Sequence, residues 1–299
     1  MTKKSLKVKD AGEDVSRYSR IDRYYQKKGI RKFYNQYRTP ELNLPLNTDQ
    51  ELNDYLLNKF HFRAIEFGNW VNNTTRANYL LGATVGFYDI NKAIQFDYEL
   101  GLFKTLGIAF GSRGTGRALA HFEPGTFVIN LTRYSRGDNP LNSGGTTALA
   151  HEFGHALDYF FGSRVAGQWA LTGGRSVKKG MNEGKVHEMV HAMDLIIREL
   201  IFDKKHITLS PYYERLERIS QKTDYFIRRN ELFARAFEQY VQDRLEVLGI
   251  QNRFLTKTKY NRIFYLMDNE KEHKERVYKR IDDLLKLMRE WIREQKKKK

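Results

Sequence analysis

The sequence predicts an α+β fold that is mainly helical and carries a small antiparallel sheet. Apolar residues recur at helical spacing in several long segments, and short apolar runs bounded by turn residues cluster between residues 107 and 132. In addition, 40% of the 299 residues are apolar and only five are proline. This amount of core material favours a globular protein and excludes the disordered and low-complexity classes.

The first predicted helix lies within residues 14–38 and is broken near Gly29, and one of its faces carries Val15, Tyr18, Ile21 and Tyr25. Residues 39–45 are expected to form a linker, and residues 48–59 a second helix. Aromatic side chains alternate with Lys and Arg in the first helix. The aromatic rings could stack on the bases of single-stranded nucleic acid while the basic side chains contact its phosphates. Packing of the aromatic face on the core explains the same pattern, and we favour it.

Three short strands are predicted in the middle of the chain, at residues 107–110 (GIAF), 117–122 (RALAHF) and 126–132 (TFVINLT). The turn pair Pro124-Gly125 joins the last two strands into an antiparallel hairpin. We expect the strand at residues 126–132 to lie at an edge of the sheet, where an extended peptide could pair with its backbone.

Four further helices are predicted at residues 146–161, 183–202, 228–248 and 269–295, with a Gly-rich loop at residues 162–182. The last helix has an apolar stripe of Val277, Ile281, Leu284, Met288 and Trp291. Such a stripe is compatible with a coiled-coil partner, but we favour packing within the chain.

The net charge of +16 comes from the two ends of the chain. Residues 1–40 carry 12 basic and 4 acidic side chains, residues 251–299 carry 16 and 8, and the centre is neutral. We therefore distinguish a basic, aromatic-rich N-terminal flank (1–55), a central domain (56–250), and a basic C-terminal amphipathic helix with a Lys tail (251–299). The basic flanks are candidates for contact with nucleic acid through its phosphates.

The chain contains no cysteine, which excludes disulfides, Cys-type zinc fingers and thiol nucleophiles. Any metal site must therefore use His, Asp and Glu. The first 15 residues have no apolar stretch typical of a signal peptide, and no apolar run is long enough to span a bilayer. We expect a soluble, intracellular protein without membrane contact.

The motif with the clearest chemical meaning is AHEFGHALD at residues 150–158, which contains an HExxH pattern. On a helix, His151 and His155 project from one face and can reach one metal ion, with Zn²⁺ expected. Glu152 lies beside them and can take a proton from a water at the metal. Chance would give about 0.01 such matches in a chain of this composition.

A second match, HEMVH, lies at residues 187–191. We favour the first match because its helix is apolar on most sides and follows a hairpin, as expected of a buried catalytic helix. The second match lies beside the apolar stripe of a one-sided amphipathic helix. His187 and His191 are therefore less favoured as metal ligands, and partly exposed packing residues are the simpler interpretation.

A catalytic zinc site normally needs a third protein ligand. Asp158 lies about 10 Å along the helix axis from the first histidine, so we expect it to orient a ligand histidine. The remaining candidates are Glu231 and Glu238 in NELFARAFEQYV. Small Ala234 would allow close helix approach near Glu231, which we therefore prefer. The alternative is that both glutamates form ion pairs with Arg235.

Four separated segments resemble a known family. They read FHFRAIEFGNWVNN (60–73), LGIAFGSRGTGRALAHFEPGTFVINLTR (106–133), ALAHEFGHALDYF (148–160) and ELFARAFEQYV (231–241). Through them, the chain from about residue 60 to residue 245 resembles the zincin-like metallopeptidase domain of the large polyvalent proteins carried by phages and conjugative elements.

The resemblance implies a gluzincin-type fold in which His151, His155 and Glu231 bind zinc and Glu152 is the catalytic base. It also implies hydrolysis of a peptide bond in a protein or peptide substrate, in the cytoplasm of a bacterial host. The competing expectation is a nucleic-acid-binding or scaffold protein whose zincin-like domain is inactive.

Overall fold

The structure is a computed structural model of the chain, and it describes residues 38–40, 42, 48–69, 71, 73–112, 120–132, 148–173, 185–220, 223–252, 255–256 and 262–298. The helix predicted at residues 14–38 lies outside these ranges except for its last residue. Helices make up most of the described residues, and the remainder includes two small sheets. The mainly helical α+β class is therefore confirmed.

The chain divides into two compact units. Unit 1 comprises Met1–Glu152 and Asp243–Thr256, and unit 2 comprises Phe153–Gln242 and Lys257–Lys299. The boundary passes through α5 (Leu149–Phe160) and α8 (Arg229–Val247), and each of these is one continuous helix. The division of the sequence at residues 55 and 250 rests on charge, which these units do not test.

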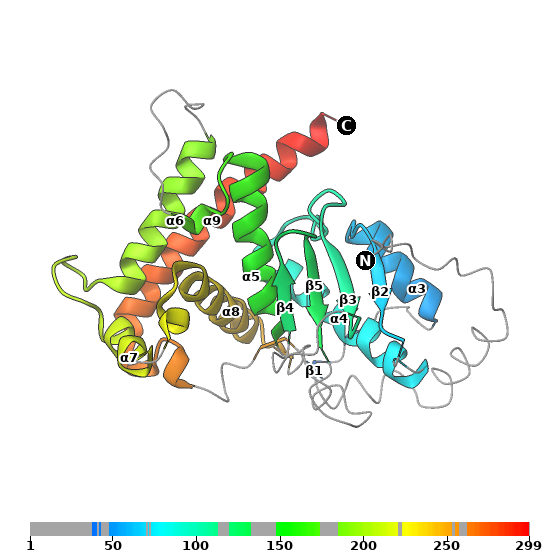
Figure 1. Cartoon of the computed structure of the whole chain (residues 1–299), viewed down its shortest axis with the longest axis horizontal. Coiled ribbons are helices and arrows are strands. Elements are labelled where there is room, and N and C mark those ends of the chain that lie inside the picture. Colours follow the sequence, from blue (N-terminus) through cyan, green and yellow to red (C-terminus); the bar gives the residue numbers. More distant parts are fainter. Residues whose placement is uncertain are drawn as a thin grey trace. The chain divides into compact units, whose positions relative to one another are not determined.

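Unit 1 contains a four-stranded sheet in the order β2-β3-β5-β4 (Figure 1). Its strands are β2 (Ile65–Phe67), β3 (Gly107–Phe110), β4 (Ala120–Glu123) and β5 (Val128–Leu131). Only β4 and β5 pair antiparallel, whereas β2–β3 and β3–β5 are parallel. The predicted β4–β5 hairpin is thus confirmed, but the expectation of an antiparallel sheet is wrong for the other two pairings.

Parallel strands need a crossover connection, and α4 (Asn73–Ile94) supplies the one between β2 and β3. We did not predict α4, because residues 79–87 are all buried and a helix buried on all sides lacks a one-sided apolar pattern. The expected edge position of β5 is also wrong. This strand lies between β3 and β4, so both of its sides are already paired.

The core of unit 1 forms around α4. The ring of Phe87 lies 6.3 Å from that of Phe60 and 4.6 Å from that of Phe62, measured between centroids. A polar contact is also buried next to this core. Both carboxylate oxygens of Asp89 accept hydrogen bonds from the side chain of Arg38, each at 2.8 Å. Arg38 belongs to β1 (Arg38–Thr39), which pairs with β6 (Gln251–Asn252) in a two-stranded sheet. This contact ties the described start of the chain to α4.

The predicted helix at residues 48–59 is confirmed in unit 1. It consists of α3 (Asp49–Asp54) followed by a π-helical turn, Tyr55–Lys59. Thr48 and Glu51 form a capping box, in which the backbone N–H of Glu51 donates to Thr48 Oγ1 at 3.1 Å and the backbone N–H of Thr48 donates to Glu51 Oε2 at 2.9 Å. This cap fixes where the helix begins.

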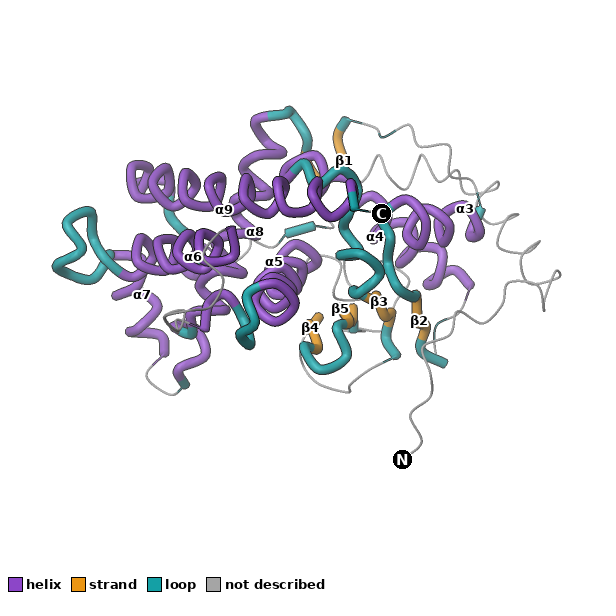
Figure 2. The backbone as a smooth tube through the Cα atoms, turned by 90° about the horizontal axis from the view of Figure 1, so that it is seen from above, coloured by secondary structure: helices purple, strands orange, loops and turns teal. Residues whose placement is uncertain are grey.

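Unit 2 is helical throughout its described elements (Figure 2). Besides the parts of α5 and α8 that belong to it, it contains α6 (Lys185–Ile201), α7 (Pro211–Ile219) and α9 (Lys271–Lys297). The helices predicted at residues 146–161, 183–202, 228–248 and 269–295 match α5, α6, α8 and α9, with ends that differ by at most three residues. Helix α7 was not predicted.

The apolar stripe of α9 packs within the chain. Val277, Ile281, Leu284 and Met288 are fully buried, and α9 runs alongside α6 (Figure 1). The ring of Trp291 meets those of Phe160 and Phe161 at centroid distances of 6.0 and 5.6 Å. The preference for intramolecular packing over a coiled-coil partner is confirmed. In the described part of the chain, no helix combines the length and apolar character needed to cross a membrane.

Candidate metal centre

Helix α5 presents two histidines on one face. His151 and His155 are four positions apart, so their side chains lie above one another on the same side of the helix. The other side of α5 is anchored in the core by buried apolar residues, which are Leu149, Phe153, Leu157 and Phe160. Burial of this side leaves the histidine face available to contribute ligands.

A glycine lets α8 approach α5 closely. A Cβ atom added to Gly154 would lie 3.3 Å from the Cα atom of Ala234 and 3.1 Å from the Cδ1 atom of Phe237. The rings of Phe153 and Phe237 also pack together, at a centroid distance of 6.4 Å. The close approach expected at Ala234 is therefore confirmed. Glu231 lies three positions before Ala234, on the same side of α8.

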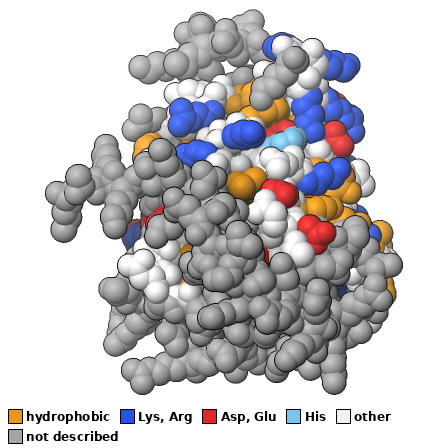
Figure 3. All heavy atoms as spheres, turned by 90° about the vertical axis from the view of Figure 1, so that its right-hand side faces the viewer, with side chains coloured by type: hydrophobic (Ala, Val, Ile, Leu, Met, Phe, Trp, Pro, Cys, Tyr) orange, Lys and Arg blue, Asp and Glu red, His pale blue; other side chains and the backbone are white. Residues whose placement is uncertain are grey.

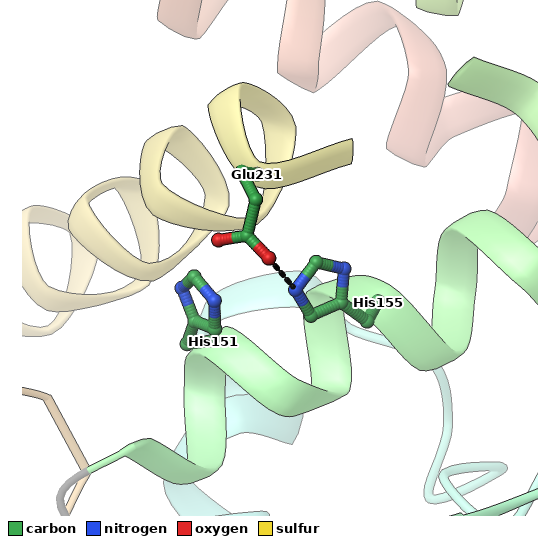
Figure 4. A group of neighbouring side chains, drawn as sticks. All are labelled: His151, His155 and Glu231. Atoms are coloured by element: carbon green, nitrogen blue, oxygen red, sulfur yellow. Dashed lines mark ion pairs between the residues drawn. The ribbon is translucent and has the colours of Figure 1, made fainter. Parts of the chain in front are cut away.

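The three side chains His151, His155 and Glu231 converge (Figure 4). Each offers one possible ligand atom, and these atoms all lie within 4.8 Å of one another. The Oε1 atom of Glu231 lies 3.3 Å from the Nε2 atom of His155. His155 and Glu231 are buried, whereas His151 is partly exposed. Within the described ranges, this is the one group of three or more His, Asp or Glu side chains that could hold a metal ion.

The donor set fits zinc. Two imidazole nitrogens and one carboxylate oxygen are the ligands of many catalytic zinc sites, which keep a fourth position for water or substrate. Ligand atoms around a tetrahedral zinc ion lie about 3.4 Å from one another, given metal–ligand distances of about 2.0–2.2 Å. The separation of 3.3 Å between His155 and Glu231 matches this value. The other pairs of ligand atoms lie at most 4.8 Å apart, so side-chain rotation has to close at most about 1.4 Å.

Arg235 contacts the other oxygen of Glu231. Its Nη1 atom lies 3.4 Å from Glu231 Oε2, and its Nη2 atom donates a hydrogen bond to the backbone carbonyl of Phe226. The ion pair expected as the alternative to metal binding is thus present for Glu231. It engages Oε2, whereas Oε1 faces His155, so the two contacts are compatible. Arg235 also restrains the carboxylate that would bind the metal.

Glu152 lies next to His151 on α5 and is buried. It is not among the three convergent side chains, as expected of a base that does not bind the metal. Its assignment as the proton acceptor stays a prediction.

Asp158 is fully buried one turn after His155, and its carboxylate holds the chain that follows α5. Both oxygens accept hydrogen bonds from Thr172, at 2.8 Å from the backbone N–H and at 2.6 Å from the hydroxyl. Burial raises the pKa of Asp158 to about 6, against the opposing effects of these hydrogen bonds and of His155. Anchoring of Thr172 is a role that the sequence did not indicate. Orientation of a ligand histidine stays a prediction.

Glu238 does not join the histidines. It is buried, and its Oε2 atom accepts a hydrogen bond of 2.8 Å from the hydroxyl of Tyr265. Burial, together with the charge of Glu238, raises the pKa of Tyr265. This arrangement keeps the tyrosine protonated as a donor to the carboxylate. The carboxylate of Glu238 therefore contacts a tyrosine, whereas the carboxylate of Glu231 contacts a histidine.

The second HExxH match lies on the exposed side of α6. His187, Glu188 and His191 are all exposed, whereas Met189 and Met193 on the same helix are buried. Neither histidine belongs to a metal-binding group within the residues that the structure describes. The position of these side chains agrees with the interpretation of a one-sided amphipathic helix.

Tyr159 lies beside the convergent side chains and was not assigned a role from the sequence. Burial raises its pKa, and the charges of Asp158 and Glu231 raise it further, while side-chain hydrogen bonds with Trp169 and Asn230 lower it. The signal that could have identified this residue is its spacing of four positions from His155, which places it on the histidine face of α5.

Part of the chain is similar to a known protein family. Residues 218–292 match the family described as large polyvalent protein-associated domain 1. The matched segment includes α8, which carries Glu231, and most of α9. This similarity links the chain to large polyvalent proteins. No curated protein and no solved structure matches the chain.

Proposed function

We propose that the chain is a zinc-dependent metallopeptidase with a zincin-like, gluzincin-type domain. The observation that carries this proposal is the convergence of His151, His155 and Glu231 from two helices. The HExxH spacing supplies the two histidines, and the contact between α5 and α8 at Gly154 brings the glutamate to them. The similarity to a domain of large polyvalent proteins agrees with the resemblance noted in the sequence. From that resemblance we extend the proposal to an origin in a phage or mobile genetic element and to action in the cytoplasm of its bacterial host.

The two histidines and Glu231 would hold Zn²⁺, which supplies Lewis-acid activation of water and of the scissile carbonyl. One carboxylate oxygen of Glu152 takes the proton of the attacking water and then delivers it to the leaving amine. Arg235 holds the second oxygen of Glu231, so that Oε1 stays directed toward His155. The packing of α5 and α8 fixes the relative positions of these groups before substrate arrives.

The role of Glu152 gives a direct test. In Glu152→Gln, zinc content should equal that of the wild-type chain, while cleavage of fluorescein-labelled casein should fall at least about a hundredfold, because a general base is lost. His187→Ala serves as the matched control, since it alters the exposed HExxH match, and it should keep both zinc and activity. Equal cleavage by the wild type and by Glu152→Gln would contradict the assignment.

The second candidate is a nucleic-acid-binding or scaffold protein with an inactive domain. The observation that favours it is the positive charge of both ends of the sequence. The face shown in Figure 3 also carries several Lys and Arg side chains, with acidic side chains between them. Deletion of residues 1–37 should then weaken salt-sensitive binding to DNA. Arg38 must remain, because its buried contact with Asp89 supports unit 1. DNA binding in a wild-type chain that holds zinc but cleaves nothing would favour this candidate.

A further inference from the structure

Trp169 is exposed although the loop that carries it is anchored. The side chain keeps 68% of its surface in solvent. Its neighbours Ala170 and Leu171 are buried, and the backbone N–H of Gln168 donates to the carbonyl of Gly162 at 2.9 Å. A Cβ atom added to Gly162 would lie 2.3 Å from the Cα atom of Ala170, so the loop passes where no other side chain fits. The exposure of Trp169 therefore does not come from a loosely held segment.

The same loop is tied to α5 beyond Trp169. Both oxygens of the buried Asp158 accept hydrogen bonds from Thr172, one from its backbone and one from its hydroxyl. Gly173 also donates its backbone N–H to the carbonyl of Ala170 at 3.1 Å. Anchors thus lie on both sides of Trp169 in the sequence, and they hold the backbone that carries the indole ring.

Tyr159 connects this indole ring to the metal centre. The two rings meet edge to face at a centroid distance of 5.7 Å and a hydrogen bond joins their side chains. Tyr159 lies four positions after His155 on α5, and it interacts with both Asn230 and Glu231 at the start of α8. Through Tyr159, the aromatic pair therefore adjoins Glu231, one of the three convergent side chains.

We infer that Tyr159 and Trp169 form an aromatic wall against which a large apolar side chain of the peptide substrate packs, next to the scissile bond. This inference rests on the proposed function. Indole and phenol rings offer broad apolar contact area with little loss of side-chain entropy on binding, and anchored loops next to a catalytic group are common sites of substrate selection. The wall would make this chain prefer aromatic or long aliphatic residues at that position.

The surrounding charge favours a peptide over a nucleic acid as the occupant. An exposed tryptophan can also stack on a base. The charges of Asp158 and Glu231, however, both act on Tyr159, and the carboxylate of Glu152 lies one turn before His155 on α5. Carboxylates repel a phosphate backbone, whereas they tolerate the neutral backbone of a peptide.

The test compares two zinc-binding probes on the zinc-loaded full-length chain by calorimetry. The probes are the hydroxamates of N-acetyl-phenylalanine and N-acetyl-glycine, which differ only in the benzyl group. The wild type should bind the phenylalanine probe about tenfold more tightly, the factor expected for partial burial of one aromatic side chain. Trp169→Ala should lose this preference and keep its zinc and its affinity for the glycine probe.

Two variants control for indirect effects. Tyr159→Phe keeps an aromatic ring and should keep the preference, while Ile207→Ala removes another exposed apolar side chain of unit 2 and should change nothing. Equal affinities for both probes in the wild type, or an unchanged preference in Trp169→Ala, would overturn the inference while leaving the metal centre intact. A wild-type chain that binds neither zinc nor the glycine probe would instead overturn the proposed function. Loss of oligo(dT) binding in Trp169→Ala, with both probes unaffected, would assign the indole to nucleic acid and overturn the inference.

Discussion

Glu231 and His155 belong to different helices, and their side chains meet with Oε1 of the glutamate 3.3 Å from Nε2 of the histidine. Helix spacing explains why the two histidines share a face, but it cannot explain this third contact. The contact depends on how closely α5 and α8 pack. The packing of the two helices and the charge balance around Glu231 therefore decide whether the third ligand is in place.

Gly154→Ala should weaken the metal centre by separating the helices. The added Cβ would meet Phe237 at 3.1 Å and the backbone of Ala234 at 3.3 Å. Alanine is the better helix former by about 1 kcal/mol, but overpacking costs about 1–3 kcal/mol, so we expect a net loss of about 1 kcal/mol in the free energy of unfolding. Urea unfolding measures this loss, and zinc affinity should fall with it. Gly125→Ala, with no atom within 4 Å of the added Cβ, is the control. A Gly154→Ala chain more stable than wild type would show that the helices can adjust.

Arg235→Met should destabilise the metal-free chain more than the zinc-bound chain. Removal of one partner of a buried ion pair leaves a buried charge uncompensated and costs about 3–5 kcal/mol. In the zinc-bound chain the metal would compensate Glu231, so a smaller loss is expected on thermal or urea unfolding. The matched control is Arg215→Met, which breaks a largely buried pair with Glu270 elsewhere in unit 2. Zinc should not change that loss. A loss at Arg235 that is equal with and without zinc would show that Glu231 serves only the ion pair.

Asp158 should make the stability of the metal-free chain depend on pH. Burial raises its pKa from 3.8 to about 6 in the folded chain, so the folded state binds an extra proton between these values. The contribution of Asp158 to the free energy of unfolding should therefore be highest below pH 3.8. It should fall as the pH rises toward 6 and then level off. The difference amounts to about 3 kcal/mol. Urea unfolding across this range should show the decline in the wild type and not in Asp158→Asn. Parallel curves for the two chains would contradict the assignment.

The sequence predicted α5, α6, α8 and α9 because each carries a distinct signal, but it did not predict α7. The apolar stripes of α6 and α9 recur at helical spacing, and the HExxH pattern and Ala234 indicated which faces of α5 and α8 carry the ligands and where the two helices approach. In unit 1, local signals predicted the helix at residues 48–59 and the β4–β5 hairpin, but neither α4 nor the order of the strands. Helix α4 is buried on all sides, and strand order depends on contacts between distant segments that no local pattern encodes.

The site was also predicted only in part. Helix spacing predicted that His151 and His155 share a face, and small Ala234 predicted that Glu231 comes close to them, which the structure shows for all three side chains. The partners of Asp158 and Glu238 lie 14 and 27 residues further along the chain, at Thr172 and Tyr265. Their contacts depend on how the intervening segments fold back, so the sequence could not assign them.

Zinc content is the most direct test of the proposed metal centre. The purified wild-type chain should hold about one zinc ion per chain, and His155→Ala and Glu231→Gln should each lose it, because two protein ligands are too few to retain the metal. Two further variants, His187→Ala and Glu238→Gln, should retain it, since these residues lie outside the convergent group. A wild-type chain without zinc, or a Glu231→Gln chain that keeps its full zinc content while Glu238→Gln loses it, would contradict the assignment of the metal centre.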